Sequence, residues 1–483
     1  MASSQTAAAT HSRQVNLLSW CIQNPCKTFA LLFAFFVTFV FSTAQWRIAH
    51  ESHLVTGDGF YYYCYARSLF FDHDVNFKNE YEDFGSVCMG KTLFPMSGGG
   101  APASDRPSGL VPDEPQPSRV PAPYGPWGGK FPEYPGNMWE IGSSILWLPF
   151  VALAHAITLA VRAAGATSLA ADGYSVLYQC AVAVGSSFYA FLGSCLVYRM
   201  LRTRFDAAVA FFPVLFLITA TTLVCYLVYQ VAYSHAQEFF VAALVLFLLF
   251  RRARFDDMSF GDAAVLGLSI GLMALVRWQM ALWGAVPLGL WLWALMTSKG
   301  RGAVFVKGLV LGAAACAAFL PQMLAWHSIY GHYITMPMDN DFGKRFLMLR
   351  FKEALLVLVS NNHGMFFWHP ITAVGVIGVF VFLFSRTSAG LRGVIVLSLV
   401  VFVAEAFVNG MVPDWWGGSS FGMRRMVGMY PLVALGLAAL LHVTRLAQGR
   451  ALLPAAAWVV ATLWNAALLF IWTFHLGGRL LPH

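Results

Sequence analysis

The stretch "TFALLFAFFVTFVFSTA", residues 28–44, is an unbroken run of uncharged and mostly apolar side chains. A helix of roughly 20 such residues crosses a hydrocarbon core of about 30 Å. Arg13 and Lys27 precede the run, and no small-residue cleavage site leads from it into a soluble domain. We therefore predict a retained first membrane helix and not a removed signal peptide, with residues 1–27 as a cytoplasmic N-terminus.

Similar apolar runs recur to the end of the 483-residue chain. Hydrophobic side chains make up 58% of the residues and charged ones 11%, whereas soluble domains are about 45–50% apolar. Single helices satisfy their own backbone groups in lipid, so this composition predicts an all-α polytopic membrane protein. The net charge of +8 comes from short basic clusters between apolar runs, which indicates membrane topology and not a nucleic-acid partner.

The basic clusters give a map of the membrane spans when they are placed on the cytoplasmic side. The map has about eleven crossings, with the N-terminus inside and the C-terminus outside. The predicted spans are residues 28–46, 174–198, 207–228, 232–250, 262–277, 279–297, 305–325, 367–385, 391–409, 427–444 and 453–474.

Residues 138–165 are also apolar enough to span the membrane, but a crossing there would move every later basic cluster to the outer side. We expect this segment to lie on or dip into the outer leaflet as a helix broken by Pro149. Residues 47–173 then form a long first outer loop with interfacial helices. Residues 28–483 form one transmembrane domain, without a separate soluble domain.

The first outer loop begins with an unusually polar stretch, "TGDGFYYYCYARSLFFDHDVNFKNEYEDFG", residues 56–85, which holds six carboxylates and five tyrosines. The tyrosines are typical of a membrane-interface anchor. Asp58 differs from the other acids because Gly57 and Gly59 flank it, and we expect these small neighbours to leave it accessible to a substrate. Asp72 and Asp74 fit either a metal site or a solvated turn, and we favour the turn.

Several arginines lie in outer segments, where the positive-inside rule does not place them. Guanidinium groups match phosphate oxygens, so these residues, together with the glycine-rich turn at residues 415–425, suggest a phosphate site. Solvated loop charges or partners of nearby acids are the alternative. The residues concerned are Arg67, Arg277, Lys344, Arg345, Arg350, Arg424 and Arg425.

Two carboxylates, Glu238 and Glu405, fall within predicted spans, and intramembrane acids are functional candidates. We expect Tyr233, Ser234 and His235 to share a cavity with Glu238, and a structural pair with Arg277 is an equal alternative. The eight cysteines show no metal-binding spacing. Cys64 and Cys88 share the first outer loop, so a pair between them stays open.

Six short motifs follow one another over most of the chain: "TGDGFYY" (56–62), "YPGNMWEIGSSILWLP" (134–149), "VAYSHAQEFF" (231–240), "LVRWQ" (275–279), "SNNHGMFFWHP" (360–370) and "DWWGGSSFGMRR" (414–425). In the order of these motifs the chain resembles the GT-C glycosyltransferases, in particular the branch with the bacterial aminoarabinose transferases and the protein mannosyltransferases. Each motif is short, and the resemblance lies in their shared order.

The resemblance implies a GT-C fold and an inverting transfer of a sugar from a polyprenyl phosphate. The acceptor would be a glycan, a lipid or a protein, and the active site would face the periplasm or cell exterior of a bacterial inner membrane. Asp58 matches the family's catalytic carboxylate. The family often has a second adjacent acid, which Gly59 replaces here, so Asp72, Asp74 and Glu80 are candidates for a secondary acid.

By position, the donor phosphate ligands implied by the resemblance are Arg424, Arg425, Lys344 and Arg345. Further residues expected to line the site are Tyr62, Arg67, His235, Glu238, Arg277, His363 and Trp416. No metal-ligand set is evident, and a divalent metal is left open as a cofactor. A transporter or lipid flippase, or an enzyme like the O-antigen ligases and polymerases, is the alternative function.

Overall fold

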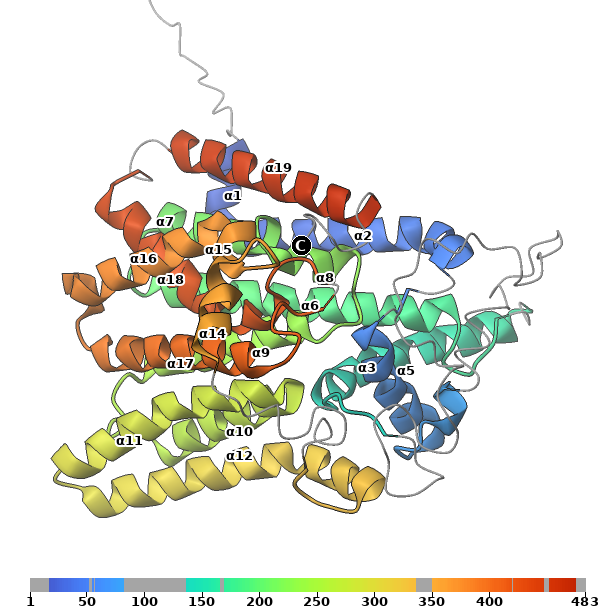
Figure 1. The fold of residues 1–483 in the computed structure, drawn as a ribbon, viewed down its shortest axis with the longest axis horizontal. Coiled ribbons are helices and arrows are strands. Elements are labelled where there is room, and N and C mark those ends of the chain that lie inside the picture. The colour runs from blue at the N-terminus through green and yellow to red at the C-terminus, as the bar shows by residue number, and fades with distance from the viewer. Residues whose placement is uncertain are drawn as a thin grey trace, which may run out of the picture.

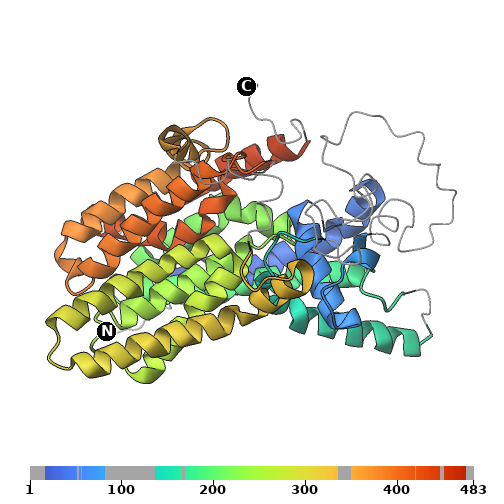
Figure 2. The same ribbon diagram turned by 60° about the horizontal axis from the view of Figure 1, so that its bottom comes forward.

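The computed structural model describes residues 17–51, 54–55, 57–81, 136–165, 169–335, 350–418, 420–446 and 451–474. Within these ranges the chain is all-helical, and most of the long helices run roughly along the longest axis of the molecule (Figures 1 and 2). The predicted all-α class is therefore confirmed for the described residues.

The first part of the chain supplies three long helices and a polar segment between the first two. The elements are α1 (Leu17–Gln23), α2 (Pro25–Glu51), α3 (Asp58–Arg67), the short π-helix η1 (Ser68–Asp72), α5 (Gly142–Ala163) and α6 (Val176–Arg202). The middle part contains α7 (Ala207–Thr219), η5 (Thr222–Val224), α8 (Cys225–Val228), α9 (His235–Arg251), α10 (Phe260–Val276), η6 (Trp278–Gly284), α11 (Ala285–Thr297) and α12 (Arg301–Tyr330).

The last part contains α14 (Phe351–Val359), α15 (Met365–Trp368), α16 (Pro370–Phe384), η8 (Arg386–Ser388), α17 (Arg392–Met411), η9 (Arg424–Met429), α18 (Tyr430–Val443) and α19 (Leu452–Phe474). The core lies around α18: in the most apolar stretch of η9 and α18, 78% of the residues are buried. In the corresponding stretch of α12, only 6% of the residues are buried. The exposed faces of α12 and α19 are rich in leucine, valine and phenylalanine, as lipid-facing surfaces are.

Eight described helices are long and apolar enough to cross a membrane, and a ninth span results if α7 and the bent segment after it count as one. This agrees with a multi-pass membrane protein. The predicted spans 232–250, 262–277 and 367–385 form α9, α10 and α16, which have 17, 17 and 15 residues. A crossing needs about 20 residues, so the count of eleven stays a prediction.

Helix α5 corrects one expectation, because it continues through Pro149 without a break. A proline inside a helix removes one backbone hydrogen bond, and packing against α6 compensates here: Trp147 donates its indole N–H to Ser186 at 3.2 Å. Helix α5 starts next to Leu275 of α10 and lies beside the first half of α6. By length and composition α5 is itself a candidate span, so the peripheral position expected for residues 138–165 stays a prediction.

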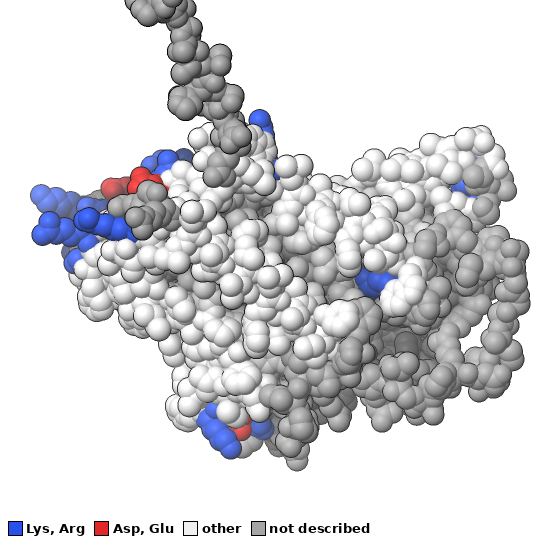
Figure 3. All heavy atoms as spheres, turned by 90° about the horizontal axis from the view of Figure 1, so that it is seen from above, with Lys and Arg blue, Asp and Glu red and all other residues white. Residues whose placement is uncertain are grey.

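The basic clusters lie mainly at one end of the long axis. The turns between α11 and α12 and between α16 and α17 are at the left of Figure 1, opposite α3 and α5. Figure 3 shows lysine and arginine gathered at this end of the molecule, next to a broad uncharged face. Such an arrangement is what the positive-inside rule predicts, with α3 on the opposite side.

Candidate functional site

The structure brings together two residues that the sequence singled out from opposite ends of the chain. Asp58 begins α3, and its Oδ2 lies 2.7 Å from Nη1 of Arg424 at the start of η9. The Asp58 side chain is 31% exposed, while that of Arg424 is 10% exposed. The Arg424 guanidinium also lies 5.1 Å from the ring centroid of Tyr233. The result is a carboxylate and guanidinium pair whose acidic side faces outward.

The glycines beside Asp58 lie where the chain is closely packed. Gly57 has φ +53°, and a Cβ there would lie 2.2 Å from the Tyr233 hydroxyl oxygen. A Cβ on Gly59 would contact Ala232 at 3.0 Å. The Asp58 backbone N–H donates to the Tyr233 hydroxyl at 3.2 Å. The glycines therefore allow the start of α3 to pack closely against residues 232–233. The Asp58 side chain is nevertheless 31% exposed, and its access to a substrate stays a prediction.

Arg425, the second predicted phosphate ligand in the glycine-rich turn at residues 415–425, pairs with a different acid. Arg425 donates to Oδ2 of Asp414 at 2.7 Å and to the Asp414 carbonyl at 3.1 Å. Gly417, Gly418 and Gly422 in the intervening loop all have positive φ, which glycine adopts without strain. Lys344 and Arg345 lie outside the described residues.

Glu238 lies at the centre of a buried polar network. One carboxylate oxygen accepts the Gly428 N–H at 2.9 Å. The other lies 2.8 Å from Nδ1 of His235 and 3.4 Å from Nε of Arg277. The structural pair with Arg277 that the sequence suggested is thus confirmed, and these contacts bring together α9, the end of α10 and η9.

Two members of the network, Glu140 and Gln279, were not predicted as site residues. Glu140 accepts the Tyr62 hydroxyl at 3.2 Å and the Trp278 N–H at 3.1 Å. Burial raises the pKa of the Glu140 carboxyl, and the nearby Arg277 opposes this shift. Gln279 donates to Glu405 and to the Arg425 carbonyl, both at 3.1 Å. Each is a polar residue within a motif quoted for the resemblance, and this was the available signal.

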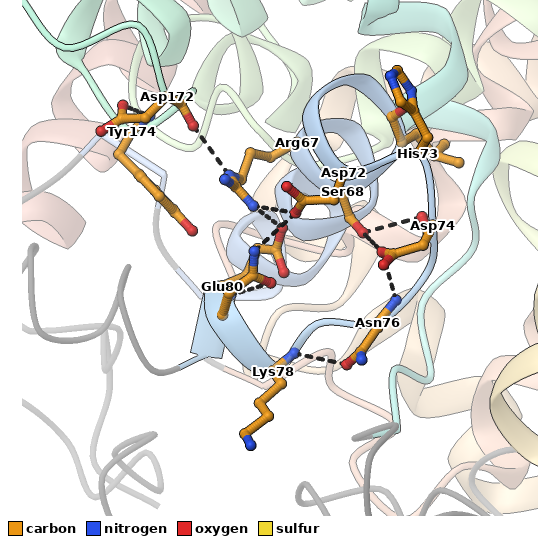
Figure 4. Close-up of polar contacts among 12 residues, drawn as sticks. Arg67, Ser68, Asp72, His73, Asp74, Asn76, Lys78, Glu80, Asp172 and Tyr174 are labelled. Carbon is orange, nitrogen blue, oxygen red and sulfur yellow. Dashed lines mark hydrogen bonds and ion pairs between the residues drawn. The ribbon is translucent and has the colours of Figure 1, made fainter.

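The candidates for a secondary acid belong to a different cluster, shown in Figure 4. Arg67 pairs with Asp72 and, at 2.7 Å, with Glu80. Burial raises the pKa of Glu80 to about 7, against the opposing effect of Arg67. Asp74 accepts the Ser68 hydroxyl at 2.7 Å and the Asn76 N–H at 3.0 Å, as in a local turn.

Asp74 agrees with the turn interpretation. Asp72 instead pairs with Arg67, as does Glu80, which bears out the alternative interpretation of Arg67 as a partner of nearby acids. Among the described residues, no three His, Cys, Asp or Glu side chains come together as a metal ion would require.

The tyrosines of α3 are not the membrane anchor that we expected. Tyr62 and Tyr63 are buried, and their hydroxyls donate to Glu140 and to the Gly173 carbonyl, the latter at 2.6 Å. Burying a tyrosine requires a hydrogen-bond partner, which these contacts supply. Helix α3 is thus packed inside the protein against α5 and the segment before α6.

The remaining predicted site residues, His363 and Trp416, lie next to aromatic rings. His363 is buried next to the Trp368 ring, and Trp416 contacts Trp415 edge-on. Cys64 is buried, and Cys88 lies outside the described residues, so a pair between them is untested.

Comparisons with known proteins add no relative. No protein-family model matches the chain, and no curated protein matches it closely enough to count as a relative. The function is therefore inferred from the residues of the site itself.

Proposed function

We propose that the protein is an inverting glycosyltransferase of GT-C type, which moves a sugar from a polyprenyl phosphate to an acceptor at the outer face of the membrane. The observation that carries the proposal is the 2.7 Å contact between Asp58 and Arg424. This contact brings a carboxylate and a guanidinium to one site. In the proposed displacement they serve as base and phosphate ligand, on opposite faces of the anomeric carbon once the donor has separated them.

The reaction needs one proton acceptor and one stabilised leaving group. The acceptor hydroxyl oxygen bonds to the anomeric carbon as its proton passes to the Asp58 carboxylate. The bond between that carbon and the phosphate oxygen breaks, and the Arg424 guanidinium stabilises the charge left on the polyprenyl phosphate. Because attack and departure occur on opposite faces of the sugar, the anomeric configuration inverts.

Because Asp58 pairs with Arg424, binding of the donor phosphate to Arg424 would free the Asp58 carboxylate to act as the base. A phosphate that takes up the Arg424 guanidinium competes with the Asp58 carboxylate for it. Asp58 then becomes available to the acceptor hydroxyl. We propose that the donor binds before the acceptor for this reason, with Arg425 as a second phosphate ligand after exchange from Asp414.

Cells that lack the protein provide the direct test. We expect their surface glycans or lipids to lose one sugar and the corresponding polyprenyl phosphate sugar to accumulate, as mass spectrometry of both fractions would show. If the protein were a transporter of another solute, its loss would leave both fractions unchanged. If it were a flippase, its loss would keep the lipid-linked sugar on the cytoplasmic side. Membrane-impermeant periodate added to intact cells would then fail to oxidise that sugar.

Arg424→Ala is expected to weaken binding of decaprenyl phosphate by roughly 10- to 100-fold, the range for a lost hydrogen bond to a charged group. The substitution removes a cation and leaves the Asp58 carboxylate to repel the phosphate. Binding can be measured by calorimetry on the full chain in nanodiscs. Arg254→Ala is the matched control, because Arg254 makes a 2.7 Å pair with Asp256 but is 68% exposed. Equal affinity of wild type and Arg424→Ala would remove Arg424 from the phosphate site.

A further inference from the structure

The turn that carries both arginines, η9 (Arg424–Met429), is held by its backbone from two directions. Oε1 of Glu238 accepts the Gly428 N–H at 2.9 Å, and Nε2 of Gln279 donates to the Arg425 carbonyl at 3.1 Å. The turn is also tightly enclosed at Gly428, where a Cβ would lie 2.0 Å from the Met280 methyl carbon. The path of the backbone is therefore fixed at both ends of the turn.

The two anchoring side chains are themselves fixed, and Arg277 joins them. Its Nη2 donates to Oε1 of Gln279 at 3.2 Å, and its Nε lies 3.4 Å from Glu238. Glu238 is fully buried in the first turn of α9, with His235 on its second oxygen. Buried charges held in this way keep a single orientation, because any rotation leaves an unpaired charge.

The side chains of the turn have a different environment from its backbone. Arg424 and Arg425 pair with Asp58 and Asp414, whose side chains are 31% and 37% exposed. Pairs with partly exposed acids are weak compared with buried ones and can exchange partners. The turn thus combines an anchored backbone with guanidinium groups that are able to change partners.

We propose that Glu238 and Gln279 are positioning residues, which hold the arginine turn so that Arg424 points at the place of the donor phosphate. The phosphate part rests on the proposed function, whereas the anchoring of the turn does not. Binding groups need to be held within roughly 0.5 Å of their productive geometry, and fixed supporting side chains provide this.

Whether Glu238→Ala raises or lowers the affinity for decaprenyl phosphate distinguishes a positioning role of Glu238 from a purely electrostatic one. Glu238 is an acid near two arginines, so its removal would strengthen anion binding if its charge were all that mattered. If it positions the turn, Glu238→Ala weakens decaprenyl phosphate binding, by roughly tenfold for a misplaced charged hydrogen bond. Glu238→Gln keeps an oxygen for the Gly428 N–H, so it is expected to retain wild-type affinity or exceed it.

The anchoring can be read without any ligand, by hydrogen–deuterium exchange of the full chain in nanodiscs. We expect amide exchange in the peptide that contains Gly428 to be roughly tenfold faster in Glu238→Ala and near the wild-type rate in Glu238→Gln. Gln279→Ala, which removes the other anchor, is expected to act as Glu238→Ala does. Glu80→Gln is the control, because Glu80 is a buried acid of the separate Arg67 cluster.

Four results decide between positioning and the alternatives. Unchanged exchange and unchanged affinity in both alanine variants overturn the proposal, as does tighter binding by Glu238→Ala. Faster exchange with weaker binding supports it. If the wild type itself binds no decaprenyl phosphate while the alanine variants still exchange faster, the anchoring stands and the proposed donor falls. Should Glu238→Ala fail to fold, the comparison of Gln279→Ala with wild type decides alone.

Discussion

Asp58→Asn is expected to lose sugar transfer by roughly 100- to 10,000-fold, the usual contribution of a general base. Asparagine has the same shape and keeps an oxygen for Arg424, but it does not accept a proton at neutral pH. The loss would be measured as the missing sugar on surface glycans of cells that lack the natural protein and produce the variant. Detergent-extracted variant and wild type should show the same folded fraction.

The affinity of the Asp58→Asn variant for the donor, in contrast to its transfer activity, is not expected to fall. Asp58 competes with the phosphate for Arg424, to which it lies at 2.7 Å. Removal of its charge therefore leaves decaprenyl phosphate affinity equal or higher. Asp256→Asn is the matched control, since Asp256 forms the same kind of pair with Arg254 at the basic end of the molecule. Near-normal transfer by Asp58→Asn would show that Asp58 is not the base.

The second large effect concerns folding, and Gly436→Leu is expected to prevent stable assembly. Helices α16 and α18 cross at glycines: a Cβ on Gly436 would lie 1.8 Å from the Gly375 carbonyl oxygen. A Cβ on Gly378 would lie 2.0 Å from the Gly436 carbonyl oxygen. Small residues allow such close backbone contact between membrane helices. Overpacking a core commonly costs about 1–3 kcal/mol, and backbone contact from both sides leaves no room to adapt here.

The measurement is the melting temperature and the yield of monodisperse protein after detergent extraction. Gly312→Leu makes the same change in α12, at a position where a Cβ meets no atom within 4 Å, and should leave both values close to wild type. If both variants were equally stable, the close crossing of α16 and α18 would not be needed for assembly.

The sequence predicted the class of fold and several site residues because the relevant signals are local. Apolar runs define the helices, and an acid such as Glu238 within one stands out. Asp58 and Arg424 were each recognised from their own short motif. Their direct contact could not be predicted, because it depends on how α3 packs against the segment before α9.

The errors of the sequence analysis arise from tertiary packing as well. Tyrosines at a membrane boundary and tyrosines in a buried helix look alike in sequence, so Tyr63 was taken for a membrane anchor. Gly57 was noted only as a small neighbour of Asp58, and its close contact with Tyr233 was missed. Gln279 was overlooked because its place in the motif "LVRWQ" was its only signal, and a neutral amide does not stand out until its partners, Glu405 and the Arg425 carbonyl, are known.

The pairing of Asp58 with Arg424 has a consequence for biosynthesis. Chains are made from the N-terminus, so Asp58 emerges from the ribosome well before Arg424. A nascent chain that has inserted as far as α17 holds Asp58 without its guanidinium and Glu238 without the Gly428 N–H. The site is completed only when α18 docks, so unfinished or truncated chains carry an isolated acid and no assembled centre.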